Sequence, residues 1–186
     1  MAPMELPEEK RKEYTMGPLK MTMLSMLGIV PVSLLGLVPF IALWGYRPIQ
    51  SGLSILSEYL FPIFIIGIVV HEGLHGVAWA CFAKNGFKSI RFGINWKYLA
   101  PYCHCKEPLR LKEYALGTAL PLIVTGIIPW VIALTIGNGF LACLGFLFTL
   151  AAAGDAIMLF TMRRLKKDAL IADHPDKIGY FVIDND

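Results

Sequence analysis

Long apolar segments alternate with polar segments along the chain. The apolar segments cover residues 22–45, 59–83, 114–136 and 140–162. Each is close to the roughly 20 residues that a helix needs to cross the hydrocarbon core of a bilayer. The pattern therefore predicts four transmembrane helices. Pro121 and Pro129 predict kinks in the third helix, which a span tolerates when neighbouring helices cover the freed carbonyls.

The segment between the second and third predicted spans has a different period. Apolar side chains alternate with polar or small ones from Ile90 to Trp96. A period of two is typical of a β-strand. Residues from about 98 to 105 can return as the partner strand. We therefore expect a small cytoplasmic-side β-hairpin over about residues 88–105, within an otherwise all-α polytopic membrane protein.

The polar segments complete the predicted organisation. Residues 1–21 form an N-terminal tail that is mobile or interfacial, residues 22–162 form the four-span membrane domain, and residues 163–186 form a C-terminal segment. Residues 46–58 are expected to be a short polar connection. The first apolar segment is too long for the apolar part of a signal peptide, and no Ala-x-Ala site follows it, so we expect it to be retained.

Composition supports a membrane protein and excludes other classes. Hydrophobic residues make up 56% of the 186 residues, which is too high for a soluble domain of this size. The four cysteines do not form a disulfide framework, because two fall in apolar spans and two share one basic loop. No nucleic-acid signature and no Gly-rich phosphate loop is present, so we expect the lipid bilayer as a partner and no nucleic acid.

The basic residues predict the orientation in the membrane. Of the 17 Lys and Arg residues, four lie in the N-terminal tail, seven in residues 84–113 and five after residue 162. Only Arg47 lies on the other side of a four-span bundle. By the positive-inside rule, both termini and the hairpin segment are then cytoplasmic.

The second span carries the chemistry-bearing motif His71-Glu72-Gly73-Leu74-His75. On a helix, His71 and His75 are one turn apart on one face, where two neutral imidazoles can share one Zn²⁺. Glu72 lies about 100° further round the helix, and can act as the general base toward a water on the metal. The alternative is a hydrogen-bonded polar cluster inside a helix bundle.

The third metal ligand has to come from elsewhere, because a catalytic zinc site has three protein ligands and one open position. Asp155 is the only acidic residue in the fourth apolar segment. Counted from the outer ends of their spans, Asp155 and His75 lie at similar depth, toward the cytoplasmic third of the bilayer. Asp155 is therefore the predicted third ligand. The alternative is a structural carboxylate at a kink or beside a cytoplasmic Lys or Arg.

Two further polar clusters leave alternatives open. His104 is a surface residue of the hairpin, a group that approaches the zinc and stabilises the oxyanion, or a part of a separate soft-metal site with Cys103 and Cys105. Asp173-His174-Pro175 reads as a turn, because proline restricts His174 to extended geometry. A packing or lid role is expected there rather than zinc ligation.

These features resemble the site-2 protease clan of intramembrane zinc peptidases. More closely, they are similar to a small bacterial family labelled putative zincin peptidases. The shared features are the motif, Tyr102 to Leu109, Leu120-Pro121-Leu122, Gly154-Asp155, and Asp173-His174-Pro175 with Gly179, over about residues 60–183. The resemblance implies zinc at His71, His75 and Asp155, catalysis by Glu72, and a bacterial multi-pass cell-membrane protein.

The leading hypothesis is a site-2 type zinc metalloendopeptidase that hydrolyses membrane protein or peptide substrates near the cytoplasmic side. The hairpin edge could hold an extended substrate by strand addition. The alternative is a catalytically inactive, zinc-stabilised membrane module that binds other proteins. It is motivated by Ala-Gly-Asp-Ala around Asp155, where better-known site-2 proteases have Asn-Pro-Asp-Gly or Leu-Asp-Gly. A metal transporter fits less well, because the polar residues gather at one level.

Overall fold

The computed structural model describes residues 11–96, 100–175 and 177–183. The chain is mostly helical and forms two compact units. The helix unit comprises Thr22–His71 and Pro121–Ile157. The sheet unit comprises the described residues up to Met21, then Glu72–Leu120, and those from Met158 onward. Parts of the predicted N-terminal tail, hairpin and C-terminal segment (residues 1–10, 97–99, 176 and 184–186) lie outside the described residues.

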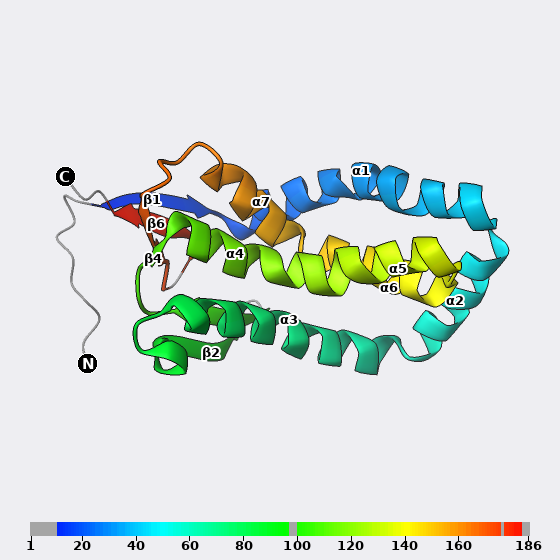
Figure 1. Cartoon of the computed structure of the whole chain (residues 1–186), viewed down its shortest axis with the longest axis horizontal. Helices are drawn as coiled ribbons and strands as arrows, with labels where there is room; N and C mark the ends of the chain where they lie inside the picture. The colour runs from blue at the N-terminus through cyan, green and yellow to red at the C-terminus, as the bar shows by residue number, and fades with distance from the viewer. Residues whose placement is uncertain (1–10, 97–99, 176, 184–186) are drawn as a thin grey trace. The chain divides into compact units, whose positions relative to one another are not determined.

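Helices provide the whole framework of the helix unit (Figure 1). They are α1 (Pro18–Trp44), α2 (Arg47–Glu58), the first half of α3 (Leu60–Phe82), the π-helix η3 (Leu122–Ile127), α5 (Ile128–Ile136), α6 (Gly139–Ala151) and the start of α7 (Ala153–Met162). Helix α6 packs against α2, α5 and η3. The core of this unit includes Ile49 of α2, Ala133 of α5 and Ala142 of α6, together with Phe40 of α1.

Glycines allow the backbones of the helix unit to approach closely. A Cβ on Gly52 of α2 would lie 2.4 Å from the backbone of Gly139, where α6 begins. A Cβ on Gly67 of α3 would lie 1.9 Å from the ring of Phe148 on α6. Small residues of this kind are typical of helix packing in membranes, where association depends on close van der Waals contact.

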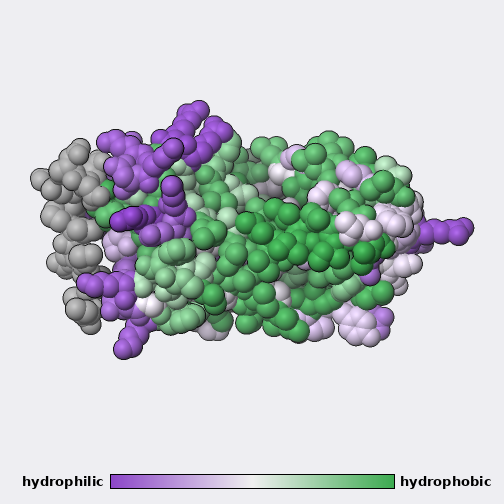
Figure 2. Space-filling view, viewed as in Figure 1, coloured by the Kyte–Doolittle hydropathy of each residue, from purple (hydrophilic) through white to green (hydrophobic). Residues whose placement is uncertain are grey.

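The outer surface of these helices is apolar. Large hydrophobic side chains such as Leu35 (70% exposed) and Phe61 (77% exposed) are uncovered, and hydrophobic residues cover the visible face over α5 and α6 (Figure 2). Within the described part of the chain, three helices are long and apolar enough to cross a membrane: Pro18–Trp44, Leu60–Phe82 and Leu111–Ile136. The bent pair α6 and α7, with a 52° break, makes a fourth if it counts as one span. Several long apolar helices thus indicate a multi-pass membrane protein, while the four-span topology and its orientation stay predictions.

The sheet unit contains two antiparallel sheets. The hairpin pairs β2 (Ile90–Asn95) with β3 (Ala100–Cys105). The second sheet has the order β1-β6-β5-β4, built from β1 (Arg11–Met16), β6 (Ile178–Ile183), β5 (Leu170–Asp173) and β4 (Leu109–Arg110). The 3₁₀-helix η2 (Gly86–Ser89) precedes the hairpin, and α4 (Leu111–Pro121) follows β4. Hydrophilic side chains gather on the visible face of this unit (Figure 2).

The structure confirms the predicted hairpin and corrects two other expectations. The hairpin is present where the alternation predicted it. The all-α description is incomplete, because residues 11–16 of the expected tail pair with Ile178–Ile183 in a sheet. The expected connection at residues 46–58 is the helix α2, whose buried residues Ile49, Gly52 and Leu56 recur at helical spacing. Strands that are distant in the sequence leave no local signal of their pairing. The polar composition of residues 46–58 favours a connection, whereas the spacing of their apolar residues indicates the helix.

Candidate metal centre

The motif lies inside α3, which runs without a break from Leu60 to Phe82. His71 and His75 are therefore one helical turn apart on one face, about 6 Å along the axis, as the spacing predicted. Glu72 follows His71 immediately and points about 100° further round the same helix. All three side chains are partly or fully buried.

His71 meets the predicted carboxylate within the helix unit. Its Nε2 lies 3.0 Å from Oδ2 of Asp155, and the two side chains are 14% and 20% exposed. Helix α6 ends at Ala151 and α7 begins at Ala153, so Asp155 stands in the first turn of α7. A carboxylate is favoured there by the amide groups at the start of a helix. The break between α6 and α7 therefore places Asp155 beside His71.

His75 is held within the sheet unit by a backbone carbonyl and an aromatic ring. Its Nδ1 lies 2.8 Å from the carbonyl oxygen of Gly117 on α4. A carbonyl only accepts hydrogen bonds, so Nδ1 carries the proton and Nε2 is the nitrogen with the lone pair that a metal ligand needs. The imidazole is 5% exposed and stacks on Trp79, with ring centroids 5.1 Å apart. This hydrogen bond selects the tautomer that a metal ligand needs.

The hairpin packs against the motif part of α3. A Cβ on Gly76 would lie 2.4 Å from the ring of Phe92 and 3.3 Å from Ile90, both on β2. Burial raises the pKa of the Cys103 thiol on β3, and the negative charge of Glu72 adds to the effect. The hairpin therefore packs one helical turn from Glu72, the general-base candidate.

The donor set fits zinc. His71, His75 and Asp155 each offer one ligand atom and are the group of described residues suited to hold a metal ion. Two imidazoles and one carboxylate with an open fourth position are the ligands of catalytic zinc sites. Two ligands of a tetrahedral zinc lie about 3.3 Å apart, close to the 3.0 Å between His71 and Asp155.

His104 is paired with Asp173 on β5. Its Nδ1 lies 2.9 Å from Oδ2 of Asp173. Strand alternation turns His104 to the opposite face of the hairpin from Cys103. The stabilisation of an oxyanion by His104 stays a prediction. This pairing has no local signal in the sequence, because 69 residues separate Asp173 from His104.

The Cys103-His104-Cys105 run is not among the metal-binding groups of the described residues. Burial raises the pKa of the Cys105 thiol to about 11. The soft-metal alternative for this part of the hairpin stays a prediction.

His174 lies in the turn between β5 and β6. The backbone N–H of Lys177 donates a hydrogen bond to its Nδ1. Its Nε2 lies 3.5 Å from Oε1 of Glu13 on β1, and its ring stacks on Phe181. These contacts agree with the expected turn and packing role.

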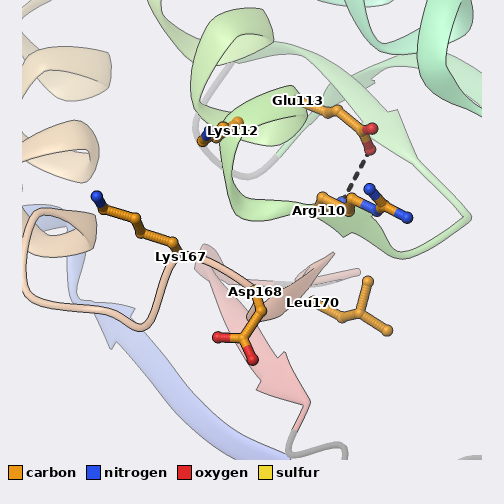
Figure 3. A pocket seen from close by; sticks show the side chains of 6 residues that line it. All are labelled: Arg110, Lys112, Glu113, Lys167, Asp168 and Leu170. Atoms are coloured by element: carbon orange, nitrogen blue, oxygen red, sulfur yellow. Dashed lines mark hydrogen bonds between the residues drawn. The ribbon is translucent and has the colours of Figure 1, made fainter.

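A separate pocket of the sheet unit has a volume of about 790 Å³ (Figure 3). Its lining residues are Arg110, Lys112, Glu113, Lys167, Asp168 and Leu170. The backbone N–H of Arg110 donates to Glu113 at its wall. None of the candidate metal ligands lines this pocket, and its mixed charges select no ligand class.

Comparison with known proteins gives one family match. The family model described as "Putative zincin peptidase" matches residues 63–170, more than half of the chain. No curated protein and no solved structure matched the chain.

Proposed function

The chain belongs to the Putative zincin peptidase family, and on that basis we propose that it is an intramembrane zinc metalloendopeptidase of the site-2 type. The family implies a zinc cofactor and a metallopeptidase activity. The long apolar helices fit a membrane protein. The finer proposal adds the position of the site, the residues that act there and the class of substrate.

The observation that carries the proposal is the pairing of His71 with Asp155 at 3.0 Å. A carboxylate and an imidazole in apolar helices are costly to bury, and such residues mark functional sites by default. His75 stands one turn further along the same helix, and its Nδ1 is hydrogen-bonded to the Gly117 carbonyl, so Nε2 is the nitrogen that would bind the metal. We assign these three residues as the zinc ligands.

Glu72 is the proposed general base. When bound, zinc would lower the pKa of a water molecule toward 7 and polarise a peptide carbonyl. Glu72 sits next to a ligand without being one, so its carboxylate can take the proton of that water and pass it to the leaving amine.

The proposed substrate is a membrane protein or peptide in extended form. A peptide bond inside a helix is shielded, so a membrane-embedded substrate must unwind before cleavage. The hairpin packs on α3 at Gly76, beside Glu72. A strand edge at this place can bind an unwound segment through backbone hydrogen bonds.

Replacement of Glu72 by Gln tests the proposal. The substitution keeps the shape of the side chain and removes the base, so cleavage of a membrane peptide should fall by a factor of roughly 10² to 10⁴. The zinc content of the purified protein should stay unchanged. Cleavage would be followed by mass spectrometry of a reconstituted peptide, with Asp168→Asn as the control for loss of a carboxylate in the sheet unit.

Two results would contradict this function. A Glu72→Gln protein with full biological activity would favour the inactive zinc-stabilised module, which does not need a base. A wild-type protein that holds no zinc after loading would remove the metal centre itself.

A further inference from the structure

Asp173 joins three elements of the sheet unit. It accepts hydrogen bonds from the Tyr114 hydroxyl of α4 at 2.8 Å and from the backbone N–H of Cys105 on β3 at 3.2 Å. Its Oδ2 also lies 2.9 Å from Nδ1 of His104. The carboxylate is only 14% exposed, and hydrogen bonds to a charged, partly buried acceptor are the stronger kind. Asp173 thus holds Tyr114 against β5 of the four-stranded sheet.

Tyr114 is also the first member of an aromatic stack that ends at a proposed zinc ligand. The rings of Tyr114 and Trp79 lie 5.1 Å apart and nearly parallel, and Trp79 stacks in the same way on His75. The Trp79 Nε1–H donates to the backbone carbonyl of Tyr114. Three residues later, the same helix offers the Gly117 carbonyl to His75. The turn of α4 from Tyr114 to Gly117 therefore sets both the plane and the hydrogen bond of the His75 imidazole.

We propose that Asp173 is a positioning residue for the zinc ligand His75, and that it acts through Tyr114 and Trp79. This inference rests on the proposed function, which makes His75 a ligand. The carboxylate anchors Tyr114, and the stack of Tyr114 and Trp79 aims Nε2 of His75. Outer groups that orient a ligating histidine affect metal affinity as well as stability. Asp173 touches neither the metal nor the substrate in this assignment.

The zinc dissociation constants of full-length Tyr114→Phe and Asp173→Asn test the proposal. Tyr114→Phe removes only the hydroxyl and keeps the stacked ring. Both variants should bind zinc about tenfold more weakly, the lower end of the range for outer-shell residues. The constant is measured by competition with a chelator in detergent, and thermal unfolding of the zinc-free protein is followed in parallel. The double variant should bind zinc no more weakly than the weaker single variant, because both changes act on one hydrogen bond. Tyr114→Phe removes its donor, and Asp173→Asn takes the charge from its acceptor.

Tyr180→Phe is the matched control. Tyr180 belongs to the same cluster, with its ring 6.2 Å from that of Tyr114, but its hydroxyl is bonded to Thr161. It should lose stability to a similar extent and keep the wild-type zinc affinity. Asp168→Asn controls for the loss of one negative charge from the C-terminal segment.

The outcomes separate this inference from the proposed function. Zinc affinity that falls in Tyr114→Phe and stays constant in Tyr180→Phe supports the positioning role. Equal loss of stability with unchanged zinc affinity in both overturns it and leaves Asp173 as a structural residue. If Asp173→Asn does not fold, Tyr114→Phe alone decides between these results. Zinc binding that survives His75→Ala would instead refute the ligand assignment itself.

Discussion

The two units stabilise their residues by different chemistry. The helix unit relies on close backbone packing, with glycines at the contacts between α2 and α6 and between α3 and α6. Its histidine, His71, is paired directly with the carboxylate of Asp155. The sheet unit relies on hydrogen bonds and stacked rings, and its histidine, His75, is held by a backbone carbonyl and Trp79. One helix thus carries two proposed ligands with different supports.

This difference has a consequence for mutation. A ligand that is supported by packing should respond to changes of side-chain volume at the helix contacts. A ligand that is supported by hydrogen bonds should respond to the loss of single polar atoms. Variants that change side-chain volume and variants that remove single polar groups therefore distinguish the two kinds of support.

The largest effect is expected for the proposed ligands themselves. His75→Ala and Asp155→Ala should each reduce the zinc content from one ion per chain to almost none, because two remaining ligands do not hold a catalytic zinc. The measurement is metal analysis of the purified, zinc-loaded proteins. His174→Ala is the control and should keep its zinc, since His174 lies in the turn between β5 and β6 and contacts Lys177 and Glu13.

Retention of zinc by Asp155→Ala would show that Asp155 is a structural carboxylate. In that case the 3.0 Å contact with His71 would be an ordinary hydrogen bond. The helix unit would then not supply a carboxylate ligand to the zinc.

A change of volume at Gly67 should have the next largest effect and should act in the helix unit. Gly67→Val places methyl groups where the Phe148 ring lies, within 1.9 Å of the new Cβ. Overpacking of this kind costs about 1–3 kcal/mol in the free energy of unfolding. Gly28→Val is the matched control, because a Cβ at Gly28 meets no atom within 4 Å.

Partial recovery of stability in Gly67→Val with Phe148→Ala would confirm the contact. Unfolding in detergent, followed by circular dichroism, measures both variants. Equal losses for Gly67→Val and Gly28→Val would mean that valine propensity, and not packing, is responsible.

Local sequence patterns were sufficient for the elements that depend on local periods. Long apolar segments predicted helices, alternation from Ile90 predicted β2, and the spacing of His71 and His75 predicted their common face. The sheet that joins Arg11–Met16 to Ile178–Ile183 was not predicted. Its strands are short, one is highly charged, and the pairing spans almost the whole chain. Long-range pairing leaves no periodic signal in either strand alone.

The candidate site follows the same division. Matching membrane depth was enough to suggest Asp155 as a partner of the motif, because depth is counted along each helix separately. The contacts of Asp173 with Tyr114 and His104 depend on how β5, α4 and β3 pack together. No spacing in the sequence contains that information.

An intermediate effect is expected at Gly117, where the sheet unit approaches His75. A Cβ there would lie 2.1 Å from Nε1 of Trp79, so Gly117→Ala must displace the indole. Alanine favours a helix over glycine by about 1 kcal/mol, and the clash has to exceed this gain to destabilise the protein. We expect a net loss of about 1 kcal/mol in unfolding free energy and zinc binding weaker by about tenfold.

Gly28→Ala shows the opposite sign if the reasoning is correct, since its Cβ enters open space inside α1. Stabilisation by both alanines, with unchanged zinc affinity in Gly117→Ala, would disprove the close contact between α4 and Trp79.

The smallest effect concerns pH and is confined to the sheet unit. The hydrogen bond from the Ser89 hydroxyl lowers the pKa of Glu107 most. Burial opposes it as the second-largest effect, and the hydrogen bonds from the Asn85 amide and the Lys84 N–H lower this pKa further. A carboxyl whose pKa is lower in the folded state stabilises the protein above its unfolded pKa of about 4.3, and this contribution is lost as the pH falls through the lower folded value. Glu107→Gln should therefore unfold more easily at pH 7 and show a flatter decline in stability below pH 5 than the wild type.

Hydrogen exchange of the η2 and hairpin amides locates this effect. Because Glu107 joins the end of α3 to η2 through Lys84, Asn85 and Ser89, faster exchange should appear there and not in α5 or α6. Glu58→Gln removes a carboxylate from the helix unit and should leave the hairpin exchange unchanged. Faster exchange in both units would mean that the two units unfold in one cooperative transition. The contrast between packing and hydrogen bonding would then apply to the contacts within each unit and not to how the units unfold.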